Sequence, residues 1–259
     1  MADTKWNDDE IVSTEMSPDT KFVFDRMTEA TIDAVDAKAT EEIIDLACGR
    51  AIDAFRLSLN GSDVYGLEPS STMIEKALAW PEPPTRTPVI LVKGIAEYLP
   101  FADQSFDKLV CKGAMDHFID MDKTFAEIAR VLKPEARLII SVANFSSLSC
   151  KLGKGLDALR KRAGGKPKQG KPFWEPPDDH NFVFNLPFLM EVLKDRFEIK
   201  SLFGVSLLWG LPGWGKFLDS IPEKWASLIL RTLDQIARAW VSRSDVIVVI
   251  ARPFQNTSS

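Results

Sequence analysis

The sequence predicts an α/β fold built on a doubly wound, mostly parallel sheet of seven strands. Short apolar runs of strand length alternate with segments of helical periodicity along most of the chain. Strands that are apolar on both sides and separated by helices are typical of a parallel sheet with helices on both faces. The length of 259 residues and the hydrophobic content of 45% are enough for one sizeable core. We therefore expect a single domain over residues 1–259.

The apolar runs place the elements of this sheet. Five runs in the first part of the chain have strand length, at residues 43–47, 63–67, 88–92, 107–111 and 137–143. Helical segments separate them, at residues 52–59, 71–79 and 121–132. Further along, the helix-like "LPFLMEVLKDR" is followed by the strand-like runs "FEIKSLFGV" and "DVIVVIARP". We expect the last run to insert beside the preceding one as part of an antiparallel hairpin at the edge of the sheet.

Three segments outside the sheet pattern are predicted to be helical cap elements, at about residues 1–36, 145–180 and 206–244. In the first, Phe24, Met27 and Thr31 fall at helical spacing, which predicts an amphipathic helix that packs on the rest of the domain or forms a lid over it. The second is rich in Lys, Gly and Pro and is expected to be a mobile insertion rather than part of the sheet. The third is dense in Leu and Ile and carries several tryptophans.

Composition and charge exclude several functional classes. A formal net charge of −5 argues against nucleic acid as a partner, because phosphate backbones are held mainly by clustered Lys and Arg. The three cysteines have no CxxC spacing, so we expect neither disulfides nor a metal site. The acidic N-terminal stretch lacks the features of a secretory signal, and no apolar run is long enough to span a membrane. These observations favour a cytoplasmic location.

One strand end indicates nucleotide binding. The stretch "EEIIDLACGRAIDAF" reads as a buried strand, a small-residue loop and a helix, which places backbone N–H groups at the carboxyl edge of the sheet. Glu68 ends the next strand about 20 residues further on, where a carboxylate can bind both hydroxyls of a ribose. The loop has Arg50 and Ala51 where such a turn usually has a second glycine.

Five phrases in order give this region a family resemblance. They are "IIDLACGRA", "VYGLEPSSTMIEKA", the two phrases joined in "VKGIAEYLPFADQSFDKLVC" with its "LPF…SFD" wording, and "FAEIARVLKPEARLIIS". In these phrases the chain resembles the class I S-adenosylmethionine-dependent methyltransferases, in particular the small-molecule subgroup. The resemblance covers about residues 41–143 closely and continues loosely through "DDHNFVFNLPFLMEVLKDRFEIKSL".

The resemblance implies a Rossmann-like methyltransferase fold that binds S-adenosyl-L-methionine and releases S-adenosyl-L-homocysteine. The implied activity is methyl transfer to a small or lipid-like organic acceptor. It makes Glu68 the ribose ligand and sets Met73 against the adenine. The residues implied to contact the cofactor are Asp45, Ala47, Cys48, Gly49, Glu68, Pro69, Met73, Ala96, Glu97 and Lys112.

Two departures from the family pattern favour a different interpretation. Ala51 replaces the last glycine of the first phrase, and Ile95 replaces the acidic residue expected to reach the adenine amino group. Glycine in such a loop allows positive φ and close backbone approach. The alternative to an enzyme is therefore a non-catalytic binding or scaffold protein built on the same fold.

Few residues are candidates for catalysis, because methyl transfer needs little beyond positioning and a base when the acceptor loses a proton. The chain has two histidines. His117 follows the fourth strand beside Asp116, and His180 follows the basic insertion. Their functional interpretation is as base or acceptor-positioning groups; otherwise His117 only starts a helix and His180 is solvated or capping. Cys48 is interpreted as a small packing residue.

The insertions suggest one further alternative. Residues 151–171 contain eight Lys or Arg against one acid, Asp157, which indicates a solvated face or a clamp for an anionic substrate or lipid headgroup. Tryptophans in the third cap segment could belong to the core, line an acceptor pocket or lie at a lipid interface; they are Trp209, Trp214, Trp225 and Trp240. The chain could thus be a peripheral membrane methyltransferase acting on a quinone, sterol or phospholipid.

Overall fold

A seven-stranded sheet forms the centre of the computed structural model, which describes residues 6–7, 16–79, 87–164 and 171–254. The strand order is β3-β2-β1-β4-β5-β7-β6. The strands are β1 Glu42–Leu46, β2 Asp63–Glu68, β3 Ile90–Lys93, β4 Phe106–Lys112, β5 Leu132–Ala143, β6 Phe197–Val205 and β7 Val246–Pro253. All of the apolar runs interpreted as strands are confirmed, with small shifts at their ends.

The sheet is mostly parallel, as predicted. Strands β1 to β5 pair in parallel, whereas β7 runs antiparallel to both β5 and β6. The last strand therefore inserts between β5 and β6 and leaves β6 at the edge. Chain order reverses direction across the sheet between β1 and β4, which places a crevice at the carboxyl ends of these two strands.

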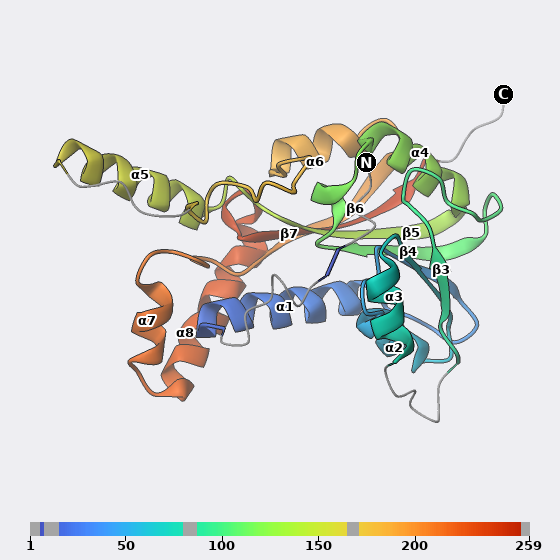
Figure 1. The fold of residues 1–259 in the computed structure, drawn as a ribbon, viewed down its shortest axis with the longest axis horizontal. Coiled ribbons are helices and arrows are strands. Elements are labelled where there is room, and N and C mark those ends of the chain that lie inside the picture. The colour runs from blue at the N-terminus through green and yellow to red at the C-terminus, as the bar shows by residue number, and fades with distance from the viewer. Residues whose placement is uncertain (1–5, 8–15, 80–86, 165–170, 255–259) are drawn as a thin grey trace.

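Helices cover both faces of the sheet (Figure 1). One face carries α4 Met121–Val131 and α6 Leu186–Leu193, whose buried side chains pack on alternate residues of the central strands. The other face carries α1 Pro18–Val35, α2 Ile52–Ser58 and α3 Ser71–Leu78. Alternation in a strand sends successive side chains to opposite faces, so Ile43 and Ile44 belong to different core clusters.

The remaining helices lie in the segments predicted as caps. The second segment holds α5 Leu148–Arg162, and the third holds α7 Trp214–Asp219 and α8 Glu223–Ala239. Helix α8 packs on β6, where Gly204 lets the helix backbone approach: a Cβ at Gly204 would lie 2.3 Å from the Ala237 carbonyl oxygen. No helix in the described part of the chain combines the length and apolarity needed to cross a bilayer.

Residues 144–180, expected to be an insertion outside the sheet, contain the helix α5. The Ser147 hydroxyl caps this helix by accepting a hydrogen bond from the Cys150 amide. Gly153 then packs on Trp174, so closely that a Cβ would lie 2.4 Å from the indole. The helix could not be predicted from composition, because glycine lowers helical propensity. In α5, however, Gly153 provides the space into which Trp174 packs. Lys166 and Lys168 of the basic insertion lie outside the described residues.

Candidate functional site

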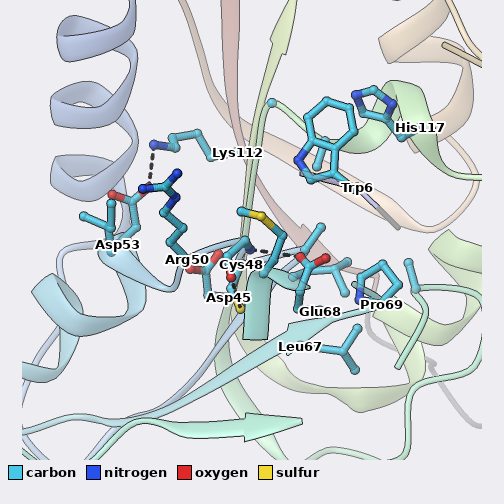
Figure 2. Close-up of a pocket in the computed structure, with 18 of the residues that line it drawn as sticks. Trp6, Asp45, Cys48, Arg50, Asp53, Leu67, Glu68, Pro69, Lys112 and His117 are labelled. Carbon is cyan, nitrogen blue, oxygen red and sulfur yellow. Dashed lines mark hydrogen bonds and ion pairs between the residues drawn. The ribbon is translucent and has the colours of Figure 1, made fainter. Parts of the chain in front are cut away.

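A cavity of about 800 Å³ lies at the carboxyl ends of β1, β2 and β4. All ten residues implied to contact a cofactor line it. Figure 2 shows Glu68, Leu67 and Pro69 on one side and Asp53, Arg50 and Lys112 on the other, with Trp6 and His117 at a third. We call the first the Glu68 side, the second, with Asp53, Arg50 and Lys112, the charged side, and the third, with Trp6 and His117, the aromatic side.

The Glu68 carboxylate is held in place by backbone amides. Gly49 donates its N–H to Oε2 at 2.9 Å, and Ser70 donates its N–H to Oε1 at 2.9 Å. The residue is 4% exposed. A carboxylate can accept about four hydrogen bonds, so one oriented by two amides can also accept hydroxyl donors from a ligand. The Ser70 hydroxyl caps α3 and positions Met73 against the loop at Gly49.

The loop between β1 and α2 adopts left-handed backbone conformations, although Ala51 stands where the family pattern has a glycine. Gly49 has φ +55° and Ala51 has φ +56°, and the Ala51 amide donates to the Cys48 carbonyl at 2.8 Å. Ala51 is fully buried at the start of α2. The turn that a glycine would form is thus retained, at the cost of a buried alanine in a region where L-residues are strained by about 1–2 kcal/mol.

Charged residues from three elements meet on the second side of the cavity. Lys112 of β4 pairs with Asp53 of α2 at 2.6 Å and donates to the Thr28 hydroxyl of α1 at 2.8 Å. Burial, reinforced by the nearby Asp53 charge, raises the pKa of the Asp45 carboxyl at the end of β1 to about 7. The family resemblance implied Asp45 and Lys112 as site residues but not Asp53, whose only signal in the sequence is its position in the first turn of α2.

Cys48 is unsuited to act as a nucleophile. Burial raises the pKa of its thiol well above the usual value, and the Asp45 charge adds to this. The reactive thiolate is therefore disfavoured at neutral pH. Gly66 of β2 accommodates the sulfur, since a Cβ there would lie 2.8 Å from Cys48 Sγ. The interpretation of Cys48 as a packing residue fits this environment.

Ile95 and Glu97 contribute to the cavity wall in different ways. Ile95 lines the cavity as an apolar residue. The Glu97 carboxylate is 5% exposed and accepts hydrogen bonds from the Ile119 and Asp120 amides at 2.7 and 3.3 Å. Glu97 therefore also fixes the segment after β4, which contributes Phe118 and Ile119 to the wall.

The aromatic side of the cavity comes from the N-terminal part of the chain. Trp6 packs against His117 with ring centroids 4.9 Å apart, and its carbonyl accepts the Ser70 hydroxyl at 2.7 Å. Helix α1 adds Phe24 and Met27. Helical spacing of Phe24 and Met27 predicted a helix that packs on the domain or forms a lid over it, but did not place these residues in the cavity lining. Among described residues, neither α5, α7 nor α8 contributes to the lining, so the four cap tryptophans do not form this pocket.

The three predicted catalytic residues are brought together behind the aromatic side. His117 lines the cavity, and its ring contacts that of His180 at 4.8 Å. Asp116 Oδ2 lies 3.0 Å from His180 Nδ1, and Asp179 Oδ2 lies 3.6 Å from His117 Nδ1. Asn181 and Phe182 create this proximity by donating backbone N–H groups to the Asp116 carbonyl at 2.8 and 3.1 Å.

This cluster can perform two kinds of chemistry. A neutral imidazole at the cavity wall can accept a proton, and carboxylates within 4 Å of its nitrogens stabilise the resulting cation. Ligand atoms of Asp116, His117 and His180 also lie within 4.8 Å of one another, close enough to hold a metal ion. The sequence predicts no metal, and Asp116 and His180 stand outside the residues that line the cavity.

Comparison with known proteins identifies the domain. Residues 44–140 match the family described as "Methyltransferase domain". Over these residues the chain is similar to methyltransferase domains. The matched residues run from β1 to β5 and include the Glu68 loop, the charged side of the cavity and His117. The sheet and the candidate site thus share one framework.

Two relatives and one solved structure show how far the similarity extends. The uncharacterized methyltransferase YcgJ of Bacillus subtilis (strain 168) is 31% identical over 109 residues, 42% of this chain and 43% of that one. The demethylmenaquinone methyltransferase of Thermobifida fusca (strain YX) is 31% identical over 160 residues, 60% of this chain and 64% of that one. The chain therefore spans about half the length of these relatives.

The solved structure shares the fold of the methyltransferase domain. The crystal structure of the [4+2]-cyclase SpnF aligns with a TM-score of 0.61 at 16% identity, covering 94% of this chain and 85% of that one. The chain thus has a class I methyltransferase-like fold. Because that neighbour is described as a cyclase, fold similarity alone does not identify the reaction, and an activity has to be inferred from the site.

Proposed function

We propose that this chain transfers a methyl group from S-adenosylmethionine to a small or lipid-like organic acceptor. The observation that carries the proposal is the convergence of all ten implied cofactor residues on one cavity at the carboxyl edge of the sheet. Its volume of about 800 Å³ lies in the upper part of the usual range for ligand sites, which leaves space for an acceptor beside a cofactor.

The cavity has the chemistry that the cofactor requires. Glu68 would accept the ribose hydroxyls, and the apolar surfaces of Met73, Ile95 and Ala96 would hold the adenine. The charged side with Asp53 and Lys112 would bind the amino-acid end. Bound S-adenosylmethionine supplies a methyl group already activated on a sulfonium, so the residues need mainly to bind and orient the reactants.

The acceptor would occupy the aromatic side of the cavity. Trp6, Phe24 and Met27 form an apolar surface there, and His117 packs beside Trp6 as a titratable group. This lining suits a flat or lipid-like acceptor with one polar group directed at His117. His117 would take the proton that the acceptor loses on methylation, and Asp116 with Asp179 would stabilise the imidazolium. The naming of some relatives as demethylmenaquinone methyltransferases agrees with this acceptor class.

Titration calorimetry with S-adenosylhomocysteine tests the proposal. We expect saturable binding at one site per chain by the wild-type protein, and none with ATP, which shares the adenosine but lacks the amino-acid end. A folded protein that gives no heat with either compound would favour the non-catalytic scaffold. Equal binding of both would show a general nucleotide site.

His117→Ala is expected to lower kcat by about 100-fold or more, because a positioned base typically contributes that factor. The affinity for S-adenosylhomocysteine should stay within about threefold, since the imidazole lies on the acceptor side. Methyl transfer from labelled cofactor to a panel of quinol, phenol and sterol acceptors measures this. His180→Asn provides the comparison, and its expected loss is smaller. A kcat that survives in His117→Ala would remove the base role, and inhibition by EDTA reversed by added metal would assign the cluster to a cation instead.

A further inference from the structure

Helix α8 exposes an apolar stripe along its whole length. Trp225, Leu228 and Ile236 are 52%, 52% and 46% exposed, and Trp240 directly after the helix is 47% exposed. These positions, with Thr232 between them, follow one another at intervals of three or four residues, which places them on one side of a helix. Scattered exposed hydrophobic residues are ordinary, but a continuous row containing two tryptophans indicates a contact surface.

The opposite side of α8 is fully engaged with the protein. Ala226, Leu230 and Ala237 are buried, and Asp234 is 3% exposed. Asp234 pairs with Arg26 of α1 at 2.9 Å and accepts the Ser206 amide at 3.1 Å. The helix is therefore anchored by its inner face, and its outer stripe is not needed to hold it on the sheet.

A row of basic residues borders the stripe. Lys224, Arg231 and Arg238 are exposed and are spaced seven residues apart, so they lie along one line of the helix. In the described part of the chain, no carboxylate lies within ion-pairing distance of any of them; Lys224 and Arg238 instead contact the rings of Trp225 and Phe203. The helix therefore presents mainly positive charge beside its apolar stripe.

Other helices add the same features at the same end of the molecule. Helices α5, α7 and α8 gather at the end opposite β3 (Figure 1). In α7, Phe217 is 46% exposed, and in α5 three leucines are 42–62% exposed beside the basic residues of that helix; they are Leu152, Leu156 and Leu159. Because the whole chain carries a net charge of −5, this positive and apolar end is a local concentration.

We propose that α8 docks this chain on the surface of an anionic phospholipid bilayer. A helix that lies in the plane of a bilayer inserts Trp, Leu and Ile among the acyl chains and directs Lys and Arg at the headgroups. The stripe and the basic row of α8 have this arrangement, and their positive charge is complementary to an anionic leaflet. The proposal goes beyond methyl transfer and does not depend on it.

The docking surface is connected to the cavity through α1. The ion pair between Arg26 and Asp234 joins α1 to α8, and Phe24 on the same helix lines the cavity. Phe24 also packs on Trp209, with ring centroids 6.0 Å apart. Helix α1 thus links the docking helix to the wall of the cavity.

Sedimentation with vesicles tests the docking of the full chain. We expect the wild-type protein to bind phosphatidylcholine vesicles containing about 30% phosphatidylglycerol, and to bind phosphatidylcholine alone at least about tenfold more weakly. Raising the salt from about 0.05 to 0.5 M should weaken binding to the anionic vesicles at least about tenfold through screening. Binding that ignores both lipid charge and salt, or no binding at all, would overturn the proposal.

Matched variants locate the contact. Arg231→Gln with Arg238→Gln should weaken vesicle binding at least about tenfold, because each basic residue near an anionic surface contributes about fivefold. Lys38→Gln with Arg137→Gln removes the same charge from exposed ion pairs with Asp36 and should change binding by less than about threefold. Trp225→Ser with Ile236→Ser should also reduce binding, with Leu78→Ser on α3 as its control.

Three results would assign the surface differently. Equal losses in the control pair would show non-specific attraction. Loss of vesicle binding only when Leu156→Ser and Leu159→Ser are introduced would place the contact on α5. Sedimentation velocity that shows a wild-type dimer, dissociated by Trp225→Ser with Ile236→Ser, without vesicle binding, would make the stripe an interface between two copies. Circular dichroism and thermal unfolding confirm that each variant is folded. If a stripe variant does not fold, the wild-type dependence on lipid charge and salt decides.

Discussion

Glu68→Ala is expected to weaken the binding of S-adenosylhomocysteine by at least about 100-fold. A carboxylate that accepts two ligand hydroxyls makes two charge-assisted hydrogen bonds, each contributing about 1.5 kcal/mol or more, and every 1.4 kcal/mol is a factor of ten. The substitution also leaves the Gly49 and Ser70 amides without their 2.9 Å acceptors. Loss of these buried bonds should lower the melting temperature and disturb the loop before α2.

Two further variants separate binding from folding. Glu75→Ala removes an exposed acid from the outer side of α3 and should leave both affinity and stability unchanged. Glu68→Gln keeps the size of the side chain and one carbonyl acceptor, so it should fold and still lose most of the affinity. Titration calorimetry and thermal unfolding measure both effects. If Glu68→Gln binds S-adenosylhomocysteine within about threefold of the wild type, the ribose role of Glu68 is wrong.

The central strands could be predicted because the signal for each lies within a few neighbouring residues of the sequence. The central residues of β1, β4 and β5 are buried on both faces, so each strand contains a short, mostly apolar run in the sequence. Glu68 could be predicted for a related reason, since a carboxylate directly after a buried run must lie at the carboxyl edge of the sheet. The apolar run of a strand and the residue that follows it are therefore enough to predict the position of Glu68 at the edge of the sheet.

The helices of the cap segments depend on contacts that the sequence does not display. The residues of α5 read as a basic, glycine-rich insertion, and its helical state is fixed by the Ser147 cap and by Trp174 packing on Gly153. The stripe on α8 is apolar at helical spacing, but only the docked inner face shows which side is exposed. Tertiary packing decides these cases, so composition alone misjudges them.

The same limit applies to the details of the site. His117 and His180 are separated by a long stretch of chain, and backbone bonds from Asn181 and Phe182 to Asp116 bring them together. The φ of +56° at Ala51 is equally invisible in the sequence, because alanine ordinarily favours negative φ. The missing glycine suggested a changed loop, whereas the structure keeps the turn with an alanine in it.

Asp45→Asn is expected to change how stability depends on pH. Burial and the Asp53 charge raise the pKa of the Asp45 carboxyl to about 7 in the folded protein, against an ordinary value of 3.8. Between these two values the folded state keeps a proton that the unfolded chain has lost. The stabilisation from this group is therefore fully present below about pH 4 and disappears as the pH rises to about 7.

The expected size of this effect is large. Each unit between the folded and unfolded pKa corresponds to about 1.4 kcal/mol, so ionising Asp45 costs the folded protein about 4 kcal/mol by pH 8. Asparagine has the same shape, can still accept a hydrogen bond from the start of α2, and carries no charge to bury. Asp45→Asn should thus be more stable than the wild type at pH 8 and nearly equal to it at pH 4.

Denaturant unfolding from pH 4 to 8 measures the difference between the two proteins. Subtracting the Asp45→Asn curve from the wild-type curve removes other titrations, including that of the buried Asp245, whose pKa is raised to about 6. Asp63→Asn, an exposed aspartate at the start of β2, is the matched control and should follow the wild type. A wild-type minus Asp45→Asn difference that stays flat across this range would show that Asp45 is ionised in the folded state throughout, with Lys112 compensating its charge.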